Sequence, residues 1–210
     1  MARTLPCSSR EAGTRRRSPD LICPDLRIDH HRPRIIGEDH ADTRLYLDQG
    51  ATQGNITQGA FTEASVGNIW QEGHENEILV QAIDHRVTIP RDPQSGQPSG
   101  QRVHLPFKFT APLNKATPLL YNALTSGEML TKVEVKWFRT SSAGKQEHFF
   151  TTRLVDATII DIDAQLPHCQ DARNADFTQL IAVSLSYRRI EWEHTVASTS
   201  GADDWRKPKA

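Results

Sequence analysis

The stretch Lys132–Leu154 constrains the fold most, because it has the pattern of two β-strands joined by a turn. In Val133–Trp137 apolar residues alternate with charged ones, which is the two-residue period of a half-buried strand. The following segment Ser141–Lys145 contains a glycine and suits a turn. The return arm His148–Leu154 is aromatic and β-branched. The sequence therefore predicts a β-hairpin here.

The rest of residues 52–205 repeats this pattern in short pieces. In Ala157–Leu166, Ile160 and Ile162 alternate with aspartates, as in a half-buried strand. The alternating core positions are odd in Ile181–Tyr187 and even in Ile190–Val196, so a β-bulge or bend is predicted near Arg188–Arg189. Many short strands favour a closed or nearly closed β-barrel. The predicted strand regions also include Ile78–Ile89, Val103–Thr110, Ile181–Tyr187 and Ile190–Val196.

Two other segments interrupt the strands. A short α-helix is predicted over about Pro118–Ser126, with Thr117 as N-cap, proline at the first helical position and Gly127 as the stop. Its apolar face comprises Leu119, Leu120, Ala123 and Leu124. The segment Thr88–His104 contains three prolines and two glycines and shows no apolar period. We predict a long projecting loop there, and loops of this length are usually functional or disordered.

Composition excludes several classes of protein. The net charge is −1 over 210 residues, so no overall field favours nucleic acid or an anionic membrane. No apolar run approaches the roughly 20 residues of a membrane span, so membrane insertion is not expected. Arg15–Arg17 is followed by a polar segment, which argues against an export signal. The three cysteines, Cys7, Cys23 and Cys169, form neither a disulfide framework nor a zinc motif.

The first 43 residues differ from the rest of the chain. They hold eight arginines but no lysine and no Phe, Tyr or Trp. Such a segment buries too little apolar surface to offset its ordering entropy. We therefore expect residues 1–43 to be disordered, residues 44–205 to form one β-barrel domain and residues 206–210 to be a tail.

No pattern reaches the standard of a catalytic or metal site. Gly73–Glu77 could supply an acid/base or metal cluster, but without a second ligand set a polar turn is the better interpretation. His194 alternates with core positions, which favours a hydrogen-bonded barrel histidine. His168 and Cys169 are adjacent, and neighbouring side chains on an extended chain point to opposite faces, so they are poorly placed to activate each other.

Two charged pairs have a functional and a simpler interpretation. Asp203–Asp204 could bind a divalent cation, but a polar chain end is usually solvated. Arg188–Arg189 could hold phosphate, although a lone basic pair is more often a solvated or interface charge. We therefore expect no enzyme activity, no cofactor and no metal. A hydrolase would require a histidine/acid site around His74 or His194.

The chain resembles the haemolysin-coregulated protein (Hcp) family of bacterial type VI secretion systems from about Gly50 to Trp205. The hairpin contributes WFRTS and GKQEHFFT, and further similar segments occur in order along the chain. The resemblance implies a mostly β fold, an Hcp-like β-barrel with one helix. The similar segments are Thr52–Phe61, Ser65–Glu77, Ser95–Thr110, Asn114–Thr140, Gly144–Ile160 and Tyr187–Trp205.

The resemblance also implies an assembly. Members of the family form hexameric rings that stack into a tube inside a contractile sheath, leave the cell with a VgrG-type spike and carry small effectors in the lumen. This chain would then be cytoplasmic before secretion and need no signal peptide. The alternative is a monomeric β-barrel that binds a small ligand or effector. The candidate ring-to-ring contact is the loop Thr88–His104, with Arg91, Asp92, Gln94, Gln97, Gln101 and Arg102.

The chain departs from the family pattern at two places. Where the family has A-G-T-S-G, Ala197–Gly201 has serine second, which would strain a turn of positive φ. The family's opening M-P-T-P-x-Y-I-S-I is absent, yet permitted codons for His40–Asp48 encode M-P-T-P-G-Y-I-S one base later. We hypothesise that residues 1 to about 49 are translated out of frame, which the nucleotide sequence would test. As written, Leu45–Gln49 must replace the first strand, Asp48 falls at an apolar position, and a charged tail could obstruct ring closure.

Overall fold

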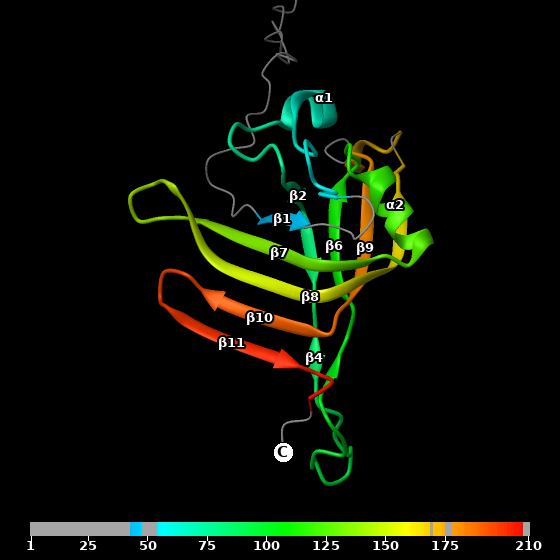
Figure 1. Ribbon diagram of the computed structural model, residues 1–210, viewed down its shortest axis with the longest axis vertical. Coiled ribbons are helices and arrows are strands. Elements are labelled where there is room, and N and C mark those ends of the chain that lie inside the picture. The colour runs from blue at the N-terminus through cyan, green and yellow to red at the C-terminus, as the bar shows by residue number, and fades with distance from the viewer. Residues whose placement is uncertain (1–42, 48–53, 169, 175–177, 208–210) are drawn as a thin grey trace, which may run out of the picture. The chain divides into compact units, whose positions relative to one another are not determined.

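The computed structural model describes residues 43–47, 54–168, 170–174 and 178–207, all within residues 36–210, the larger of two units into which the chain divides. Strands dominate this unit (Figure 1). The strands are β1 (Thr43–Leu47), β2 (Ile78–Val80), β3 (Ala82–Asp84), β4 (Val87–Thr88), β5 (Val103–His104), β6 (Phe107–Pro112), β7 (Met129–Thr140), β8 (Gln146–Gln165), β9 (Leu180–Ser186), β10 (Arg189–His194) and β11 (Thr199–Asp204). The helices are α1 (Glu63–Val66), α2 (Thr117–Ser126) and the short 3₁₀ turns η1 (Gly67–Ile69) and η2 (Ala172–Asn174).

Nine of these strands form one antiparallel sheet, and β4 and β5 form a separate ribbon. The main path runs β2-β1-β7-β8-β9-β6-β3, while β10 pairs with β8 and β11 pairs with β10. The two ends of the path, β2 and β3, are separated in sequence by Gln81 alone, whose N–H donates to the carbonyl of Thr110 at 2.8 Å. Within the described residues no ladder joins β2 to β3, so the predicted barrel is open at this point.

The predicted hairpin is confirmed, and its return arm is longer than expected. β8 has 20 residues and includes the run that begins at Ala157. The first half of β8 pairs with β10 and the second half with β9. The pairing partner changes next to Asp156, which has a φ of 52°. β9 ends at Ser186 and β10 begins at Arg189, and the chain bends at Arg188 between them, so the predicted bend is confirmed. The Arg188 side chain pairs there with the Asp156 carboxylate at 2.8 Å. A bulge between Ile159 and Asp161 leaves Ile160 exposed, which breaks the alternation seen in the sequence.

The helix prediction is confirmed to within one residue. Thr117 is helical, and the N-cap is Ala116, so the predicted cap was wrong. The reason is local, because the Asn114 side chain accepts the Ala116 N–H at 2.9 Å and shapes the start of the helix instead. Gly127 ends α2 in the left-handed region, as predicted. The sequence did not indicate α1, which is too short to show a helical period. No helix in the described part of the chain is long and apolar enough to cross a membrane.

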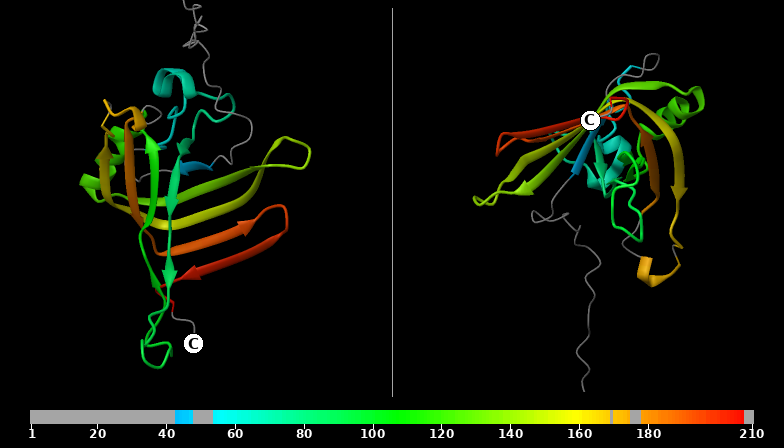
Figure 2. Two further views of the ribbon diagram at one scale, coloured as in Figure 1. Left: turned by 180° about the vertical axis from the view of Figure 1, so that it is seen from behind. Right: turned by 90° about the horizontal axis from the view of Figure 1, so that it is seen from below.

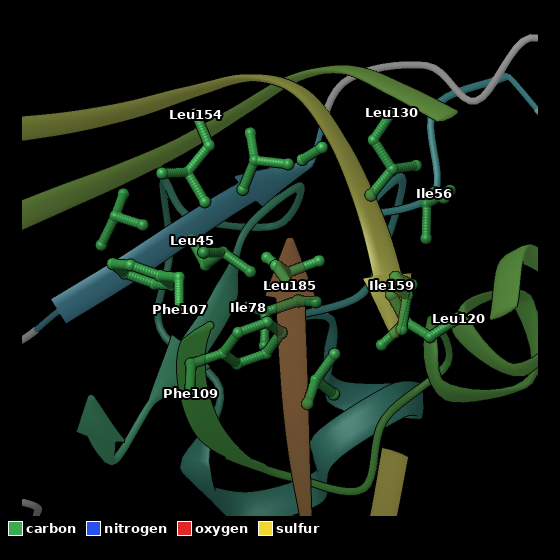
Figure 3. Close-up of a cluster of buried hydrophobic side chains, with 14 of the residues drawn as sticks. Leu45, Ile56, Ile78, Phe107, Phe109, Leu120, Leu130, Leu154, Ile159 and Leu185 are labelled. Atoms are coloured by element: carbon green, nitrogen blue, oxygen red, sulfur yellow. The ribbon is translucent and has the colours of Figure 1, made fainter. Parts of the chain in front are cut away.

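The core lies inside the curled sheet, with α2 covering one end (Figure 3). Leu45 on β1 is fully buried opposite Ile78 and Val135. The chain as written therefore supplies a first strand, two residues earlier than the predicted Leu45–Gln49; Asp48 lies outside the described residues. Burying a side chain of this kind contributes about 1.5–3 kcal/mol. The largest fully buried apolar side chains are Leu45, Ile56, Phe61, Ile78, Phe107, Phe109, Leu120, Leu130, Leu154 and Ile181.

Ser198, in the turn between β10 and β11, has a φ of 55°. This conformation is costly for a residue with a side chain, and the position is the one where the family pattern has glycine. We expect Ser198→Gly to raise the free energy of unfolding by about 0.5–1 kcal/mol, measured by urea denaturation. Ser200→Gly on the extended strand β11 is the matched control and should not stabilise. Equal effects of the two substitutions would contradict the explanation.

Candidate functional site

The segment between β4 and β5 projects from the curled sheet as a narrow ribbon, seen at the foot of Figure 1. β4 and β5 pair at its base, and farther out the Ser99 N–H donates to the carbonyl of Pro90 at 2.9 Å. The predicted projecting loop is confirmed, although Thr88 and Val103–His104 are paired as short strands. The loop is thus a braced extension whose two arms lie side by side.

The tip of the loop is a preformed turn built around Asp92. Its carboxylate accepts the Gln94 N–H at 2.8 Å and the Ser95 hydroxyl at 3.0 Å, and its carbonyl accepts the Gly96 N–H at 2.9 Å. The bond from the Gln94 backbone, and then that from Ser95, lowers the pKa of Asp92. These local bonds fix the tip without help from the rest of the molecule, so a partner would meet an ordered surface.

The predicted self-assembly residues divide into two groups. Arg102 does not face outward: its Nη2 donates to the carbonyls of Asp204 at 2.9 Å and Lys207 at 3.2 Å, and its Nε donates to the Asp203 carboxylate. Arg102 therefore fastens the loop to the C-terminal strand. The remaining five, Arg91, Asp92, Gln94, Gln97 and Gln101, are exposed on the loop.

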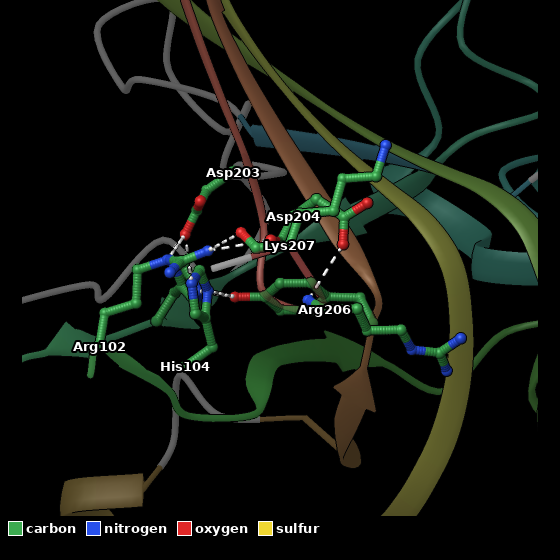
Figure 4. Close-up of polar contacts among 8 residues, drawn as sticks. Arg102, His104, Asp203, Asp204, Arg206 and Lys207 are labelled. Carbon is green, nitrogen blue, oxygen red and sulfur yellow. Dashed lines mark hydrogen bonds and ion pairs between the residues drawn. The ribbon is translucent and has the colours of Figure 1, made fainter. Parts of the chain in front are cut away.

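We call the polar cluster at the base of the loop the clasp; it comprises His85, Arg102, His104, Tyr187 and Asp203. Nε2 of His104 lies 2.8 Å from Oδ2 of Asp203, and its Nδ1 lies 2.9 Å from the Tyr187 hydroxyl. His85 Nε2 lies 2.7 Å from the same hydroxyl. Figure 4 shows Arg102 and His104 converging on Asp203. The clasp joins residues that are far apart in sequence, since His85 and Tyr187, like Arg102 and Asp203, are more than 100 positions apart.

Burial and charge shape the acid–base properties of the clasp. The His104 side chain is only 3% exposed, and Tyr187 is buried. Burial raises the pKa of Tyr187 above its usual range, so its hydroxyl keeps its proton. The hydrogen bond from Arg102, and then that from His104, lowers the pKa of Asp203, which remains a carboxylate. The clasp is thus a hydrogen-bonded chain with an anion at one end.

This arrangement corrects the interpretation of Asp203–Asp204 as a solvated chain end. Asp203 is held by Arg102 and His104, because β11 runs back along β10 to the base of the loop. Asp204 has the more local role, accepting the Arg206 N–H at 3.1 Å. No group of three or more His, Cys, Asp or Glu residues suited to a metal occurs in the described ranges.

The other candidate residues occupy separate places. His74 lies 2.7 Å from Glu77, which also accepts from Lys136 at 2.7 Å, so Gly73–Glu77 is a polar turn before β2, as interpreted. His194 accepts the Ala197 N–H at 3.0 Å, in line with the predicted hydrogen-bonded histidine. Arg188 pairs with Asp156 and Arg189 pairs with Glu191. His168 lies in a loop, and Cys169 lies outside the described residues.

A second feature, which we call the aromatic cleft, was not indicated by the sequence. The outer parts of β7, β8, β10 and β11 extend beyond the core as an arm (Figure 2). A cavity of about 290 Å³ lies against this arm, where Trp137 donates its indole N–H to Thr152 at 3.1 Å. Most of the side chains that line the cavity are aromatic or aliphatic, and Thr152 and His85 are the polar ones. Its lining comprises Ile83, His85, Phe107, Trp137, Phe150, Thr152 and Trp192.

Exposed apolar side chains occur at the opposite end of the β7–β8 ladder. Met129 begins β7 and is 50% exposed, and Ile160, the bulged residue of β8 two positions past the end of the ladder, is 48% exposed. Trp137 and Phe150, which line the cleft, pair near the other end of the same ladder. One pair of long strands therefore carries an apolar recess at one end and protruding apolar groups, Met129 and Ile160, at the other.

Comparison with known proteins identifies the family. Residues 50–194 match the family model described as "Type VI secretion system effector, Hcp". The chain belongs to the Hcp family. It is 60% identical over 161 residues to the "Major exported protein" of Pseudomonas aeruginosa, an alignment that covers 77% of this chain and 94% of that protein.

Solved Hcp structures share the fold. The structure titled "Crystal structure of Hcp protein" is 56% identical with a TM-score of 0.77, covering 80% of this chain and 100% of that one. "Secreted protein Hcp3 from Pseudomonas aeruginosa" is 48% identical with a TM-score of 0.68 and the same coverage. The family resemblance and the mostly β, Hcp-like fold predicted from the sequence are confirmed.

Proposed function

We propose that this Hcp-family chain is a structural subunit of the type VI secretion inner tube, assembled as stacked hexameric rings and exported from the cell. The observation that carries the proposal is the family match over residues 50–194, supported by 60% identity to a major exported protein. In this proposal the lumen carries small effectors, the sheath and a VgrG-type spike are partners, and the role is mechanical rather than catalytic.

The two ends of the β7–β8 ladder support ring formation. A head-to-tail contact uses two different surfaces, so it leaves one of each free and repeats until the ring closes. The aromatic cleft and the exposed Met129 and Ile160 are such a pair of surfaces. We propose that these two side chains of one copy pack into the cleft of the next, which removes both apolar surfaces from water.

The projecting loop supports stacking of the rings. It extends from the base of the sheet with an ordered tip and exposed polar side chains, Arg91, Asp92, Gln94, Gln97 and Gln101. A preformed loop loses little conformational entropy when it binds. We propose that it crosses from one ring to the next, as the family resemblance implied.

Size-exclusion chromatography with light scattering, followed by negative-stain microscopy of the full chain, tests the proposal. Rings of about six subunits are expected, and a single subunit would instead favour the monomeric ligand-binding alternative. We further expect Ile160→Glu to weaken ring association by tenfold or more, about 1.4 kcal/mol, because it places a charge in an apolar contact. Thr125→Glu on exposed α2 adds the same charge elsewhere and is the control. Equal ring fractions for both variants would contradict the assigned contact.

A further inference from the structure

Fastening the loop does not by itself require two histidines in the clasp. We propose that the chain His85–Tyr187–His104–Asp203 is a proton-controlled latch, which holds the loop base while at most one imidazole is charged and releases it when both are. The latch itself does not depend on the proposed function. Only its consequence, that pH would regulate the stacking of rings, rests on that function. Its structural basis is the chain of three contacts, at 2.7, 2.9 and 2.8 Å.

With both imidazoles neutral, every group in the chain has a partner. His104 donates its Nε2–H to Asp203 and accepts the Tyr187 O–H at its bare Nδ1. His85 donates its Nε2–H to the Tyr187 oxygen. The hydroxyl donates once and accepts once, so the latch is closed.

One added proton can also be accommodated. Protonated His104 donates from Nε2 to Asp203 and from Nδ1 to the Tyr187 oxygen. The Tyr187 hydroxyl then reverses and donates to Nε2 of His85, whose proton lies on its other ring nitrogen. The charged imidazole faces the Asp203 carboxylate, so the latch stays closed.

A second proton breaks the pattern. Both imidazolium rings must then donate to the single Tyr187 oxygen, and the tyrosine O–H loses both of its acceptors within the chain. Two positive charges lie within 2.9 Å of one buried oxygen, and Asp203 contacts only one of them. Opening the latch allows water to solvate the second charge.

The surrounding charges determine the direction of the pH response. Burial, and then His104, lowers the pKa of His85, whereas Asp84 opposes the shift. In the released loop His85 regains an ordinary pKa near 6.5, so the open state binds more protons below about that pH. Acid therefore favours opening. The groups facing His85 are Asp84 on β3, His104 on the return arm of the loop, Tyr187 before β10 and the uncharged Phe107 on β6; Arg102 and Asp203 act through His104.

Hydrogen–deuterium exchange on the full chain tests the latch. The probe is the Leu105 N–H at the loop base, which donates to the carbonyl of Arg86 at 3.0 Å. After correction for intrinsic exchange rates, its protection should fall at least tenfold between pH 7.5 and 5.5. His85→Gln keeps a donor but cannot titrate, so its protection should stay high and independent of pH. Tyr187→Phe removes the hydroxyl that links the two histidines, so protection of the Leu105 N–H in this variant should be low at both pH values.

His194→Gln, outside the latch, is the control and should respond to pH like the unaltered protein. Protection that is independent of pH in the unaltered protein, or that remains pH-dependent in His85→Gln, would overturn the latch. The exchange measurement can be made on rings and on single subunits, and both are compared because His85 also lines the aromatic cleft. If the protein forms rings but protection of the loop base does not depend on pH, the latch alone is refuted. If protection depends on pH but the protein is always a single subunit, the proposed function alone is refuted.

Discussion

Replacing Asp92–Gly100 with a tight Asn-Gly turn is expected to leave rings intact and to abolish their stacking into tubes. The removed segment contains the exposed tip and most of the loop's outward-facing polar groups. β4 and β5 already pair at the base, and Asn-Gly suits a two-residue connection, so the shortened arms can meet without disturbing the core. The loss should be essentially complete, because the proposed axial contact disappears.

Negative-stain microscopy would count tubes and rings, and secretion into the medium would be measured in parallel. The control shortens a different exposed hairpin turn, Ser141–Lys145 between β7 and β8. It is expected to preserve tubes. Tubes and secretion that persist without Asp92–Gly100 would refute the assignment of this loop to the ring-to-ring contact.

Local patterns predicted the elements that depend on local physics. The hairpin, α2 and the Thr88–His104 loop follow from alternation, a helical apolar face and clustered prolines. The boundaries were less accurate where tertiary contacts decide them. Ile78–Ile89 was expected as one run but forms β2, β3 and β4, because Gln81 bends toward Thr110 and the chain leaves the sheet at His85.

The clasp could not be predicted, because its members are far apart in sequence. Arg102 and His104 alternate on one arm of the loop, a weak sign that they share a face. Nothing in the sequence shows that Asp203 meets them, since this follows from β11 running back along β10. The aromatic cleft could not be predicted for the same reason, because its Trp and Phe residues come from four strands and each has the sequence pattern of an ordinary core position.

The out-of-frame hypothesis for residues 1–49 stays a prediction. The family match begins at residue 50, and the described residues include only Thr43–Leu47 of the segment in question. Arg44 and Leu45 are nevertheless buried there, and Arg44 lies over the ring of Phe61 at 4.5 Å. The nucleotide sequence across codons 38–52 is the measurement that checks the hypothesis, and absence of an ATG bridging codons 40 and 41 would refute it.

Asp203→Ala is expected to lower the free energy of unfolding by about 1–3 kcal/mol at pH 7. The substitution removes the acceptor shared by Arg102 and His104 and leaves both donors at a site where the His104 side chain is almost fully buried. Asp203 is 12% exposed and Arg102 18%, so solvent screens part of the attraction and the lower half of the range is expected. Urea denaturation would measure the loss, and Asp204→Ala, its neighbour on β11, should change stability by less than about 0.5 kcal/mol.

The loss of stability caused by Asp203→Ala should depend on pH. Arg102, and then His104, lowers the pKa of Asp203 in the folded state below its unfolded value near 3.9. The carboxylate therefore stabilises the fold above that pH, and this contribution is lost as the pH falls through the lowered folded-state pKa. The difference between the unaltered protein and Asp203→Ala should be largest near neutral pH, where the latch is closed, and should be lost once the carboxylate is protonated in both states. A difference that stays constant down to pH 2 would mean that Asp203 acts through packing rather than through its charge.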